Sequence, residues 1–305
     1  MTRDQPVDLL ASLYSENVVR ICAPMVRKSK LPLRRLVRKY SCDVAFTPMI
    51  IAESFLASKT ARDCAFSTDS DDHPLVIQFA AKTAFELAES AEIVSPFADG
   101  IDLNCGCPQP WALREGYGCY LISQPDLVRD IIRQTQNRVT IPVSIKIRVH
   151  DDLKETVRLV QNAEQAGCSW ITVHGRTVTQ RNEPPNYDAI RLVRESVGIP
   201  VVANGDIRSL SDVENVVSRT GVNGVMVARG ILQNPAMFAG FSVTPKECIS
   251  NWISMCLSAR VPFFYCHQQL MSMMEKLHSR KQKREFNTLT NLKQVIDYLE
   301  SHNEI

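Results

Sequence analysis

The sequence predicts an α/β protein, a (β/α)8 TIM barrel followed by a small C-terminal helical domain. Three observations lead to this fold class. About eight short apolar runs recur through roughly the first 230 residues, amphipathic stretches lie between them, and most runs turn polar or reactive where they end. A doubly wound open sheet is the structural rival, but it would gather such residues at one switch point. Their spread over many strand ends favours the barrel.

Length and composition set the class of protein. The chain has 305 residues, 35 lysines and arginines against 33 acidic residues, and a formal net charge of +2. It is long enough to bury a full core without disulfides. No run approaches the roughly 18–20 apolar residues of a membrane span, and the N-terminus lacks the basic-then-apolar block of a secretory signal. We therefore expect no membrane association, and collagen, coiled coil, disorder and small disulfide scaffolds are excluded.

Ten cysteines are scattered through the chain. Without a secretory signal they are expected to be reduced and mostly buried. This predicts an intracellular protein, with the cytoplasm as the first expectation and the nucleus and mitochondrion left open. No CxxC pair or Cys/His cluster has the spacing of a zinc site, so we predict no metal. We expect a monomer.

Most predicted strands are continuous apolar runs, as in parallel sheets covered by helices. They are Val18–Ala23, Val44–Thr47, Leu75–Ala80, Gly100–Asn104, Val143–Ile147, Trp170–His174, Pro200–Ala203 and Gly224–Ala228. Several predicted helices start at cap-type residues, namely Ser123, Asp151 and Ser209. These helices are Ala81–Ile93, Ser123–Gln136, Asp151–Ala166 and Ser209–Ser218.

A different pattern begins after about Gly240. Three helices are predicted there, over Pro245–Leu257, Tyr265–Ser279 and Asn287–Glu300, with a basic run at residues 280–284 between two of them. The chain is therefore divided into an N-terminal extension (1–16), a barrel (17–241) and a helical domain (242–305). The acidic segment 69–72 is predicted to be a loop.

Two glycine-containing segments follow the seventh and eighth strands, Asn204-Gly205-Asp206 and Ala228-Arg229-Gly230. In barrels these loops often bind phosphate through backbone N–H groups and a helix N-terminus. Arg229 would add a charge-assisted contact. The alternative is a pair of ordinary strand–loop glycines. The position of both segments favours a phosphorylated cofactor or substrate.

Three polar side chains at strand ends are candidates for the barrel mouth. Lys146 could hold an anion or form a Schiff base, or it could pair with a structural carboxylate such as Asp102. His174 ends the next strand and is less informative alone. The Gln78 amide both donates and accepts, which suits a flat heterocycle with alternating N–H and C=O groups.

Cys107 lies in Asn-Cys-Gly-Cys-Pro just past the fourth strand. Glycine and proline impose a sharp turn that would present one thiol to the mouth. A thiol protonated near neutral pH can act as a general acid, and it becomes a nucleophile if a neighbour lowers its pKa. Cys105 is the weaker candidate because it belongs to the strand end. The alternative is that both cysteines are structural.

Basic residues crowd two segments. Arg27, Lys28, Lys30, Arg34, Arg35, Arg38 and Lys39 follow the first strand, and Lys276, Arg280, Lys281, Lys283 and Arg284 lie in the tail. In the first segment, apolar residues would face inward and leave a basic outer face. A solvated surface is one interpretation, and a polyanionic partner is the other.

Together these residues resemble the tRNA-dihydrouridine synthases over roughly residues 18–235, and the helical tail is similar too. The matching segments are Ala23-Pro24-Met25, Gln78, residues 101–108 with Gly116-Tyr117-Gly118, Lys146-Ile147-Arg148, His174-Gly175-Arg176, Asn204-Gly205-Asp206 and Ala228-Arg229-Gly230. The likeness is greatest to the eukaryotic branch that acts on D-loop uridines 20a and 20b. One segment departs from the wider family: Val26-Arg27-Lys28-Ser29-Lys30 replaces Ala-Gly-(Val/Ile)-Thr-Asp, so this loop would contact flavin through backbone groups.

The resemblance implies FMN at the barrel mouth, NADPH as reductant and tRNA as substrate. Flavin N5 would deliver hydride to C6 of uracil, and Cys107 would protonate C5. The implied FMN-binding residues are Pro24, Met25, Val26, Gln78, Lys146, His174, Asn204, Gly205, Asp206, Ala228 and Arg229. The implied tRNA and uracil contacts are Asn104, Arg148, Arg176, Lys281, Lys283 and Arg284.

The residues alone leave rivals from other classes open. A Schiff-base aldolase would use Lys146 and the same phosphate loops. A flavin reductase of free nucleotides would bind no nucleic acid. A non-catalytic RNA-binding barrel would bind no flavin.

Overall fold

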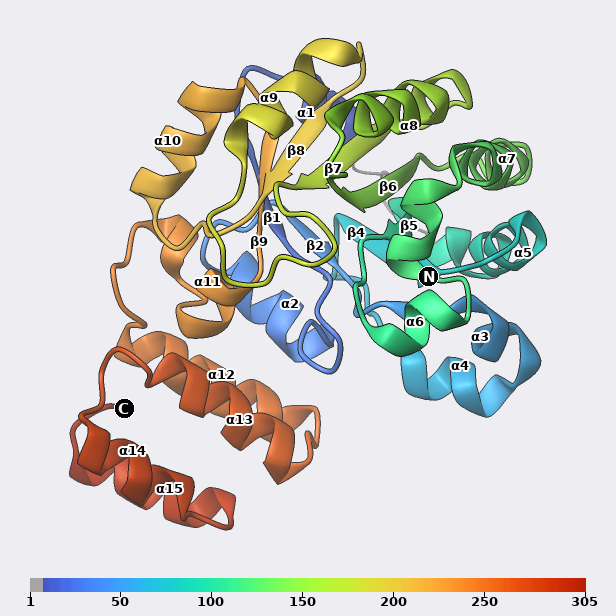
Figure 1. Ribbon diagram of the computed structural model, residues 1–305. Coiled ribbons are helices and arrows are strands. Elements are labelled where there is room, and N and C mark those ends of the chain that lie inside the picture. The colour runs from blue at the N-terminus through green and yellow to red at the C-terminus, as the bar shows by residue number, and fades with distance from the viewer. Residues whose placement is uncertain (1–7) are drawn as a thin grey trace.

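The computed structural model describes residues 8–305. Its centre is a closed barrel of eight parallel strands (Figure 1). They are β1 (Val19–Cys22), β2 (Val44–Phe46), β4 (Leu75–Ala80), β5 (Gly100–Cys105), β6 (Val143–Arg148), β7 (Trp170–His174), β8 (Val201–Asn204) and β9 (Gly224–Val227). The pairings β1–β9 and β2–β4 close the ring, and the short β3 (Ile50–Ile51) adds to β4. The predicted barrel is confirmed, and each predicted strand end lies within one residue of the observed one.

The helices cover the outside of the barrel and follow the strands in chain order (Figure 1). They are α2 (Leu31–Arg38), α3 (Ala52–Ala57), α4 (Lys59–Ala65), α5 (Ala84–Val94), α6 (Pro110–Arg114), α7 (Pro125–Gln136), α8 (Leu153–Gln165), α9 (Tyr187–Ser196), α10 (Leu210–Thr220) and α11 (Arg229–Gln233). Ser209 caps α10 as predicted. Asp152 rather than Asp151 caps α8, and α7 starts at Pro125 instead of using Ser123 as its cap.

The interior of the barrel is closed at the N-terminal end of the strands by α1 (Leu9–Tyr14). Leu9 and Leu13 are almost fully buried and pack in one cluster with Phe46 and Trp170. Burying a leucine side chain contributes about 1.5–3 kcal/mol. The helix therefore plugs one end of the barrel, and the polar strand ends lie at the opposite face.

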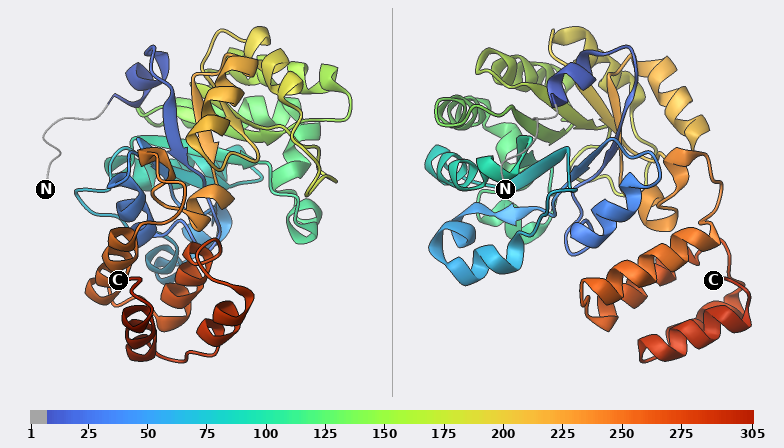
Figure 2. Two further views of the ribbon diagram at one scale, coloured as in Figure 1. Left: turned by 90° about the vertical axis from the view of Figure 1, so that its left-hand side faces the viewer. Right: turned by 180° about the vertical axis from the view of Figure 1, so that it is seen from behind.

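Four helices, not three, form the tail: α12 (Lys246–Ser258), α13 (Phe263–Met273), α14 (Arg280–Asn287) and α15 (Leu292–Ser301). The expectation that the basic run 280–284 lies between helices is wrong, because it forms the start of α14. Ser279 and Gln282 make a reciprocal capping box that starts this helix. Figure 2 shows the tail as a separate layer beside the barrel.

The basic outer face expected on α2 is only partly present. Arg34 is 1% exposed and binds the buried Asp72 through Nε at 2.9 Å and Nη2 at 2.6 Å. Arg38 reaches the same carboxylate at 3.4 Å, and Arg35 pairs with Asp69 and Asp71. Residues 69–72 form a loop as predicted, and its acids neutralise one side of α2.

Among residues 8–305, no helix combines the length and apolar character needed to cross a lipid bilayer.

Candidate active site

Strand periodicity brings the polar candidates together inside the barrel. Side chains of a strand alternate between the two faces of the sheet. The residues that fall on the inward-facing positions are Gln78, Asp102, Asn104, Ser144, Lys146, Arg148, Thr172, His174 and Asn204, two residues apart within each strand. The register aligns Asn104 with Lys146, and His174 with both Arg148 and Asn204. These polar groups therefore lie side by side in the interior of the barrel, contributed by five neighbouring strands, β4 to β8.

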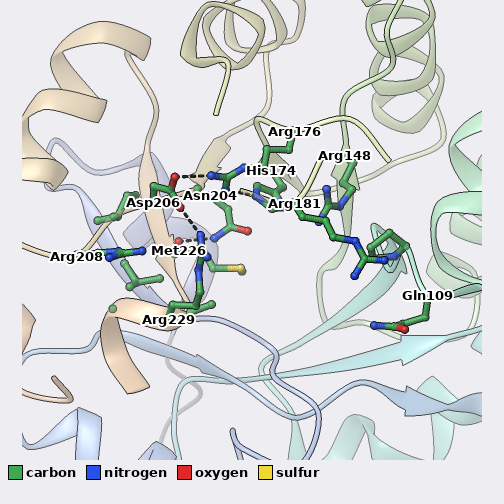
Figure 3. A pocket seen from close by; sticks show the side chains of 16 residues that line it. Gln109, Arg148, His174, Arg176, Arg181, Asn204, Asp206, Arg208, Met226 and Arg229 are labelled. Atoms are coloured by element: carbon green, nitrogen blue, oxygen red, sulfur yellow. Dashed lines mark hydrogen bonds and ion pairs between the residues drawn. The ribbon is translucent and has the colours of Figure 1, made fainter. Parts of the chain in front are cut away.

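A cavity of about 310 Å³ opens at this end of the barrel (Figure 3). Five arginines and one aspartate contribute the charged groups of its wall, so its formal charge is strongly positive. The predicted residues that line it are Arg148, His174, Arg176, Asn204, Gly205, Asp206, Ala228 and Arg229. Such a wall is suited to an anion such as a phosphate.

Asp206 organises one side of this pocket. Its carboxylate pairs with Arg176 and Arg229 (Figure 3), and these arginines hold its pKa below the ordinary value against the opposing effect of burial. Its backbone is left-handed, with φ 49°, and Gly205 before it has φ 139°. A Cβ on Gly205 would lie 2.8 Å from Cβ of Pro185. Glycine is thus required where the loop turns toward the cavity.

The wall also has backbone N–H groups that could bind phosphate oxygens. Helix α11 begins at Arg229, so its first N–H groups have no carbonyl partner within the helix. A Cβ on Gly230 would lie 2.5 Å from the carbonyl oxygen of Ile207. The two glycine segments therefore meet, as expected if they form one phosphate site.

His174 stands between the two sides of the pocket in Figure 3. Burial lowers its pKa far below the usual value, and the positive charges of Lys146, Arg148 and Arg176 act in the same direction. Nη1 of Arg176 donates to Nε2 at 3.2 Å. The imidazole is therefore neutral, with its proton on Nδ1, and cannot add to the positive charge of the pocket.

Lys146 is paired through its backbone with β5 and β7, but its side chain makes no hydrogen bond or ion pair to another residue within 8–305. The pairing with Asp102 considered from the sequence is not formed as a direct contact. Burial lowers the pKa of Lys146 to about 8, although the negative charge of Asp102 opposes this shift. Burial raises the pKa of Asp102 to about 6 despite hydrogen bonds from Ser144 and Gln78. The Lys146 side chain thus has no direct acidic partner, and it does not line the 310 Å³ cavity, although Arg148 two residues later on the same strand does.

Gln78 and Asn104 form a hydrogen-bonded chain beneath the mouth. Nε2 of Gln78 donates to Asp102 at 2.7 Å, and its Oε1 accepts from Nδ2 of Asn104 at 2.8 Å. Gln78 is fully buried. Oδ1 of Asn104 accepts the backbone N–H groups of Gly106 and Cys107, at 3.1 and 2.9 Å. The chain links the barrel interior to the turn that carries the candidate thiol.

Cys107 is partly exposed in that turn, whereas Cys105 is fully buried in the outer core. Burial raises the pKa of the Cys105 thiol well above its usual range. The backbone N–H of Cys119 donates to the Cys107 carbonyl at 3.0 Å. A Cβ on Gly118 would lie 2.5 Å from that carbonyl oxygen. Residues 116–119 therefore support the Cys107 turn from behind, and only a glycine allows the approach.

The loop after β1 carries Pro24, Met25 and Val26. Ser29 accepts the Met25 N–H through Oγ at 2.9 Å, and the side chain of Val26 is 60% exposed. These three residues lie at the same end of the barrel but do not line the 310 Å³ cavity.

The basic segment after β1 contacts the tail. Lys28 donates to Gln268 at 2.9 Å, Lys30 lies 5.1 Å from the Tyr265 ring centroid, and Lys39 donates to Asn251 at 3.1 Å. Part of this charge therefore joins the barrel to α12 and α13.

The predicted tail residues lie on α14, beyond α12 and α13 from the barrel (Figure 1). Lys281 lies 3.8 Å from Glu285, and Lys283 lies 3.0 Å from Glu275. Arg284 is exposed, with no ion pair to another residue in the 8–305 range. The positive charge of this basic run is thus partly neutralised by two glutamates of the same helical domain.

Three polar residues of the pocket were not predicted from the sequence, Gln109, Arg181 and Arg208. Arg208 follows Asp206 by two positions in a predicted phosphate loop, so its position was a usable signal. Arg181 lies in the long loop between β7 and α9, and no local pattern marks it. In the 8–305 segment no group of three or more His, Cys, Asp or Glu residues could hold a metal ion.

Comparisons with known proteins find related chains over almost the whole length of this one. The model of a family described as "Dihydrouridine synthase (Dus)" matches residues 21–304. A mouse protein named "tRNA-dihydrouridine(20a/20b) synthase [NAD(P)+]-like" is 54% identical over 98% of this chain and 94% of its own length. A Schizosaccharomyces pombe "tRNA-dihydrouridine(20a/20b) synthase [NAD(P)+]" is 41% identical over 97% and 91%. A rat "tRNA-dihydrouridine(16/17) synthase [NAD(P)(+)]-like" is 38% identical over 83% of this chain and 59% of its own.

Proposed function

Because this chain belongs to the dihydrouridine synthase family, and is therefore an oxidoreductase, we propose that it binds FMN, uses NADPH and reduces uridines 20a and 20b of tRNA. The position within the D-loop is supported by the names of the relatives at 54% and 41% identity. The observation that carries the cofactor is the positive pocket at the strand ends, with five arginines and one aspartate.

The pocket fits the phosphate of FMN. The backbone of Gly205, Asp206, Ala228 and Arg229 would hold the phosphate oxygens, with the guanidinium of Arg229 alongside. Asp206 would not repel the phosphate strongly, because two arginines already balance its charge. A dianion would be stabilised by the arginines that remain without an acidic partner.

The flat part of the cofactor requires polar groups on one edge and packing on its faces. Lys146 and Asn204 would provide the polar groups, with the fully buried Gln78 behind them, and neutral His174 together with Pro24, Met25 and Val26 would pack on the ring. Gln78 reaches the site through its hydrogen bond to Asn104. Lys146 carries a charge that no acidic side chain neutralises by direct contact, so it would favour a negatively charged ring.

Bound reduced FMN would supply a hydride from N5 to C6 of the uracil. Cys107 would donate its thiol proton to C5, and solvent would return that proton. Asn104 holds the Cys107 turn through two N–H groups, and we assign it a uracil contact as well. A uridine must leave its stack to reach this depth, at a cost of a few kcal/mol that a D-loop reduces.

The tRNA would be held by two groups of basic residues. Arg148 and Arg176 lie at the mouth, and Lys281, Lys283 and Arg284 lie on the helical tail. Contacts from the tail to the phosphodiester backbone give affinity without base choice.

The first test is whether the purified protein is yellow and releases FMN on denaturation. We expect it to oxidise NADPH slowly alone and to form dihydrouridine in tRNA that lacks this modification. A folded, colourless protein that takes up no flavin on reconstitution would contradict the proposal.

The same preparation separates the rivals. Covalent trapping of a carbonyl substrate by borohydride on Lys146 would favour an aldolase. Reduction of free uridine nucleotides with no salt-sensitive binding of tRNA would favour a nucleotide reductase, because polyanion binding releases counterions.

A further inference from the structure

Arg148 lies between two loops that carry different parts of the site. Its Nε donates to the carbonyl oxygen of Gly106, 3.2 Å away, in the turn that carries Cys107. Its Nη1 donates to the carbonyl oxygens of Thr177 at 2.7 Å and Gln180 at 2.9 Å. One side chain from β6 therefore joins the loop after β5 to the loop between β7 and α9.

The second loop, residues 177–183, carries Arg181 of the anion pocket. It is braced internally: Oε1 of Gln180 accepts the Thr177 N–H at 2.9 Å, and the Glu183 carboxylate accepts the N–H groups of Arg181 at 2.7 Å and Asn182 at 3.0 Å. Because the loop is braced in this way, a group that holds Thr177 and Gln180 also positions Arg181. Figure 3 shows Arg148 and Arg181 on the same side of the pocket, opposite Asp206 and Arg229.

The chemistry of Arg148 suits this linking role. Its planar guanidinium presents several donors in fixed directions, which a lysine ammonium cannot do. The residue is only 8% exposed, so the three carbonyl contacts are largely shielded from water. Among the described residues, 8–305, Nη2 of Arg148 has no protein partner, so a ligand contact remains possible at the same time.

We propose that Arg148 is a positioning residue that couples the loop carrying Cys107 to the loop carrying Arg181, so that the acid and one side of the anion pocket are placed together. The importance of the two loops rests on the proposed function, whereas the coupling is a property of the folded protein and is measured without turnover.

The test compares Arg148→Lys with wild type as full-length purified protein without tRNA, at equal flavin content whether or not flavin is bound. Two readouts are followed by peptide mass spectrometry: alkylation of Cys107 by iodoacetamide, and trypsin cleavage after Arg181. We expect both rates to rise at least threefold, because a lysine cannot span both loops. The matched control is Arg158→Lys, on the outer side of α8, where the arginine side chain is 59% exposed. This control should leave both rates unchanged.

Turnover gives an independent readout. If Arg148 positions the acid, Arg148→Lys should lower kcat for dihydrouridine formation at least tenfold and change KM for tRNA less than threefold. A raised KM with wild-type alkylation and cleavage rates would show that Arg148 only contacts substrate and would overturn the coupling. A change at only one of the two loops would overturn it as well.

Two further comparisons keep the result interpretable. Arg148→Gln is the second variant if Arg148→Lys does not fold, and it should raise both rates too. Arg181→Ala removes one positive charge from the pocket, so it should weaken FMN binding. It keeps the backbone carbonyls that Arg148 binds, so it should leave Cys107 alkylation at the wild-type rate. A wild type that forms no dihydrouridine would contradict the proposed function, and the two loop rates would still decide the coupling.

Discussion

Burial lowers the pKa of Lys146 to about 8, so this lysine titrates within the range of ordinary assays. Below that pH it is an ammonium, and above it the charge is lost. FMN affinity should therefore fall as the pH rises through about 8, and Lys146→Met should remove that step. Fluorescence titrations with FMN between pH 7 and 9.5 measure the affinity at each pH. The same pH dependence of affinity in wild type and Lys146→Met would show that Lys146 does not contact the cofactor.

The same pKa has a consequence for stability. An unfolded lysine has its ordinary pKa of 10.5. Between about pH 8 and 10.5 the unfolded chain therefore binds the proton that the folded chain has released. Stability rises with pH wherever the unfolded state binds more protons. Lys146 thus destabilises the empty barrel near neutral pH, and an anionic ligand would offset that cost.

Cys107 and Cys105 form a matched pair of thiols two residues apart. Cys107→Ala should keep FMN and tRNA binding and lose most dihydrouridine formation, because the Cys107 thiol is partly exposed whereas the Cys105 thiol is buried. Cys105→Ala alters the outer core and should retain most turnover. Single-turnover assays with reduced enzyme make the comparison, and equal rates for Cys107→Ala and wild type would exclude a role as acid.

At the scale of elements, Gly118 determines where the Cys107 turn lies. Its φ is 62°, and a Cβ there would lie 2.5 Å from the Cys107 carbonyl oxygen. Gly221 at the end of α10 has nearly the same φ, 65°, with nothing within 4 Å of such a Cβ. Backbone strain should cost both Gly118→Ala and Gly221→Ala about 1–2 kcal/mol. Only Gly118→Ala should also lower kcat, by at least tenfold with unchanged FMN content; similar kcat values for both variants would contradict this.

The buried pair Arg34–Asp72 fixes α2 against the loop 69–72. Asp72→Asn would leave the Arg34 charge buried without a carboxylate, which should cost about 3–5 kcal/mol of unfolding free energy. Asp126→Asn is the matched control, because the Asp126–Arg129 pair is exposed and should contribute about 0–1 kcal/mol. Urea denaturation followed by circular dichroism measures both, and a small loss for Asp72→Asn would show that α2 is held by its apolar face alone.

At the scale of the whole molecule, the tail adds a basic surface away from the pocket. Replacing Lys281, Lys283 and Arg284 together by alanine should weaken tRNA binding and reduce its salt dependence. The slope of log affinity for tRNA against log salt concentration should change by less than the loss of three unpaired charges would cause, because Glu285 and Glu275 already pair with the two lysines. Lys154→Ala with Arg158→Ala on α8 is the control, and a salt slope unchanged by the tail substitutions would assign α14 to a solvated surface.

Periodicity explains how much of the fold was predictable. The strand bounds are predictable to within a residue because a strand covered by helices is a short, mostly apolar run, and this pattern is local. The fourth tail helix was missed because its start depends on a side chain–backbone capping box at Ser279, which a basic run conceals. Asp151 and Asp152 have the same capping propensity, so the sequence does not distinguish them as the cap of α8. Helix α7 instead starts at Pro125, and Ser123 is not its cap.

The candidate site likewise has residues that a local sequence pattern reveals and residues that it does not. Lys146, His174 and Asn204 are recognisable because a polar residue at the end of an apolar strand is unusual in itself. The partners of these residues are not recognisable, since Arg181 and Gly118 are brought to the site by loops with no local signature. Arg34 was placed on the wrong surface because its partner, Asp72, is 38 residues away.

The sequence by itself determined the barrel, its eight strands, the family and the strand-end residues, because each follows from a short-range pattern or from residue identity. The tertiary structure alone decided which charges are free. It buried Arg34, balanced Asp206 with two arginines and left Lys146 without a direct partner. It also placed Arg148 between two loops. These outcomes depend on distances between residues far apart in the chain, and only closure of the barrel sets those distances.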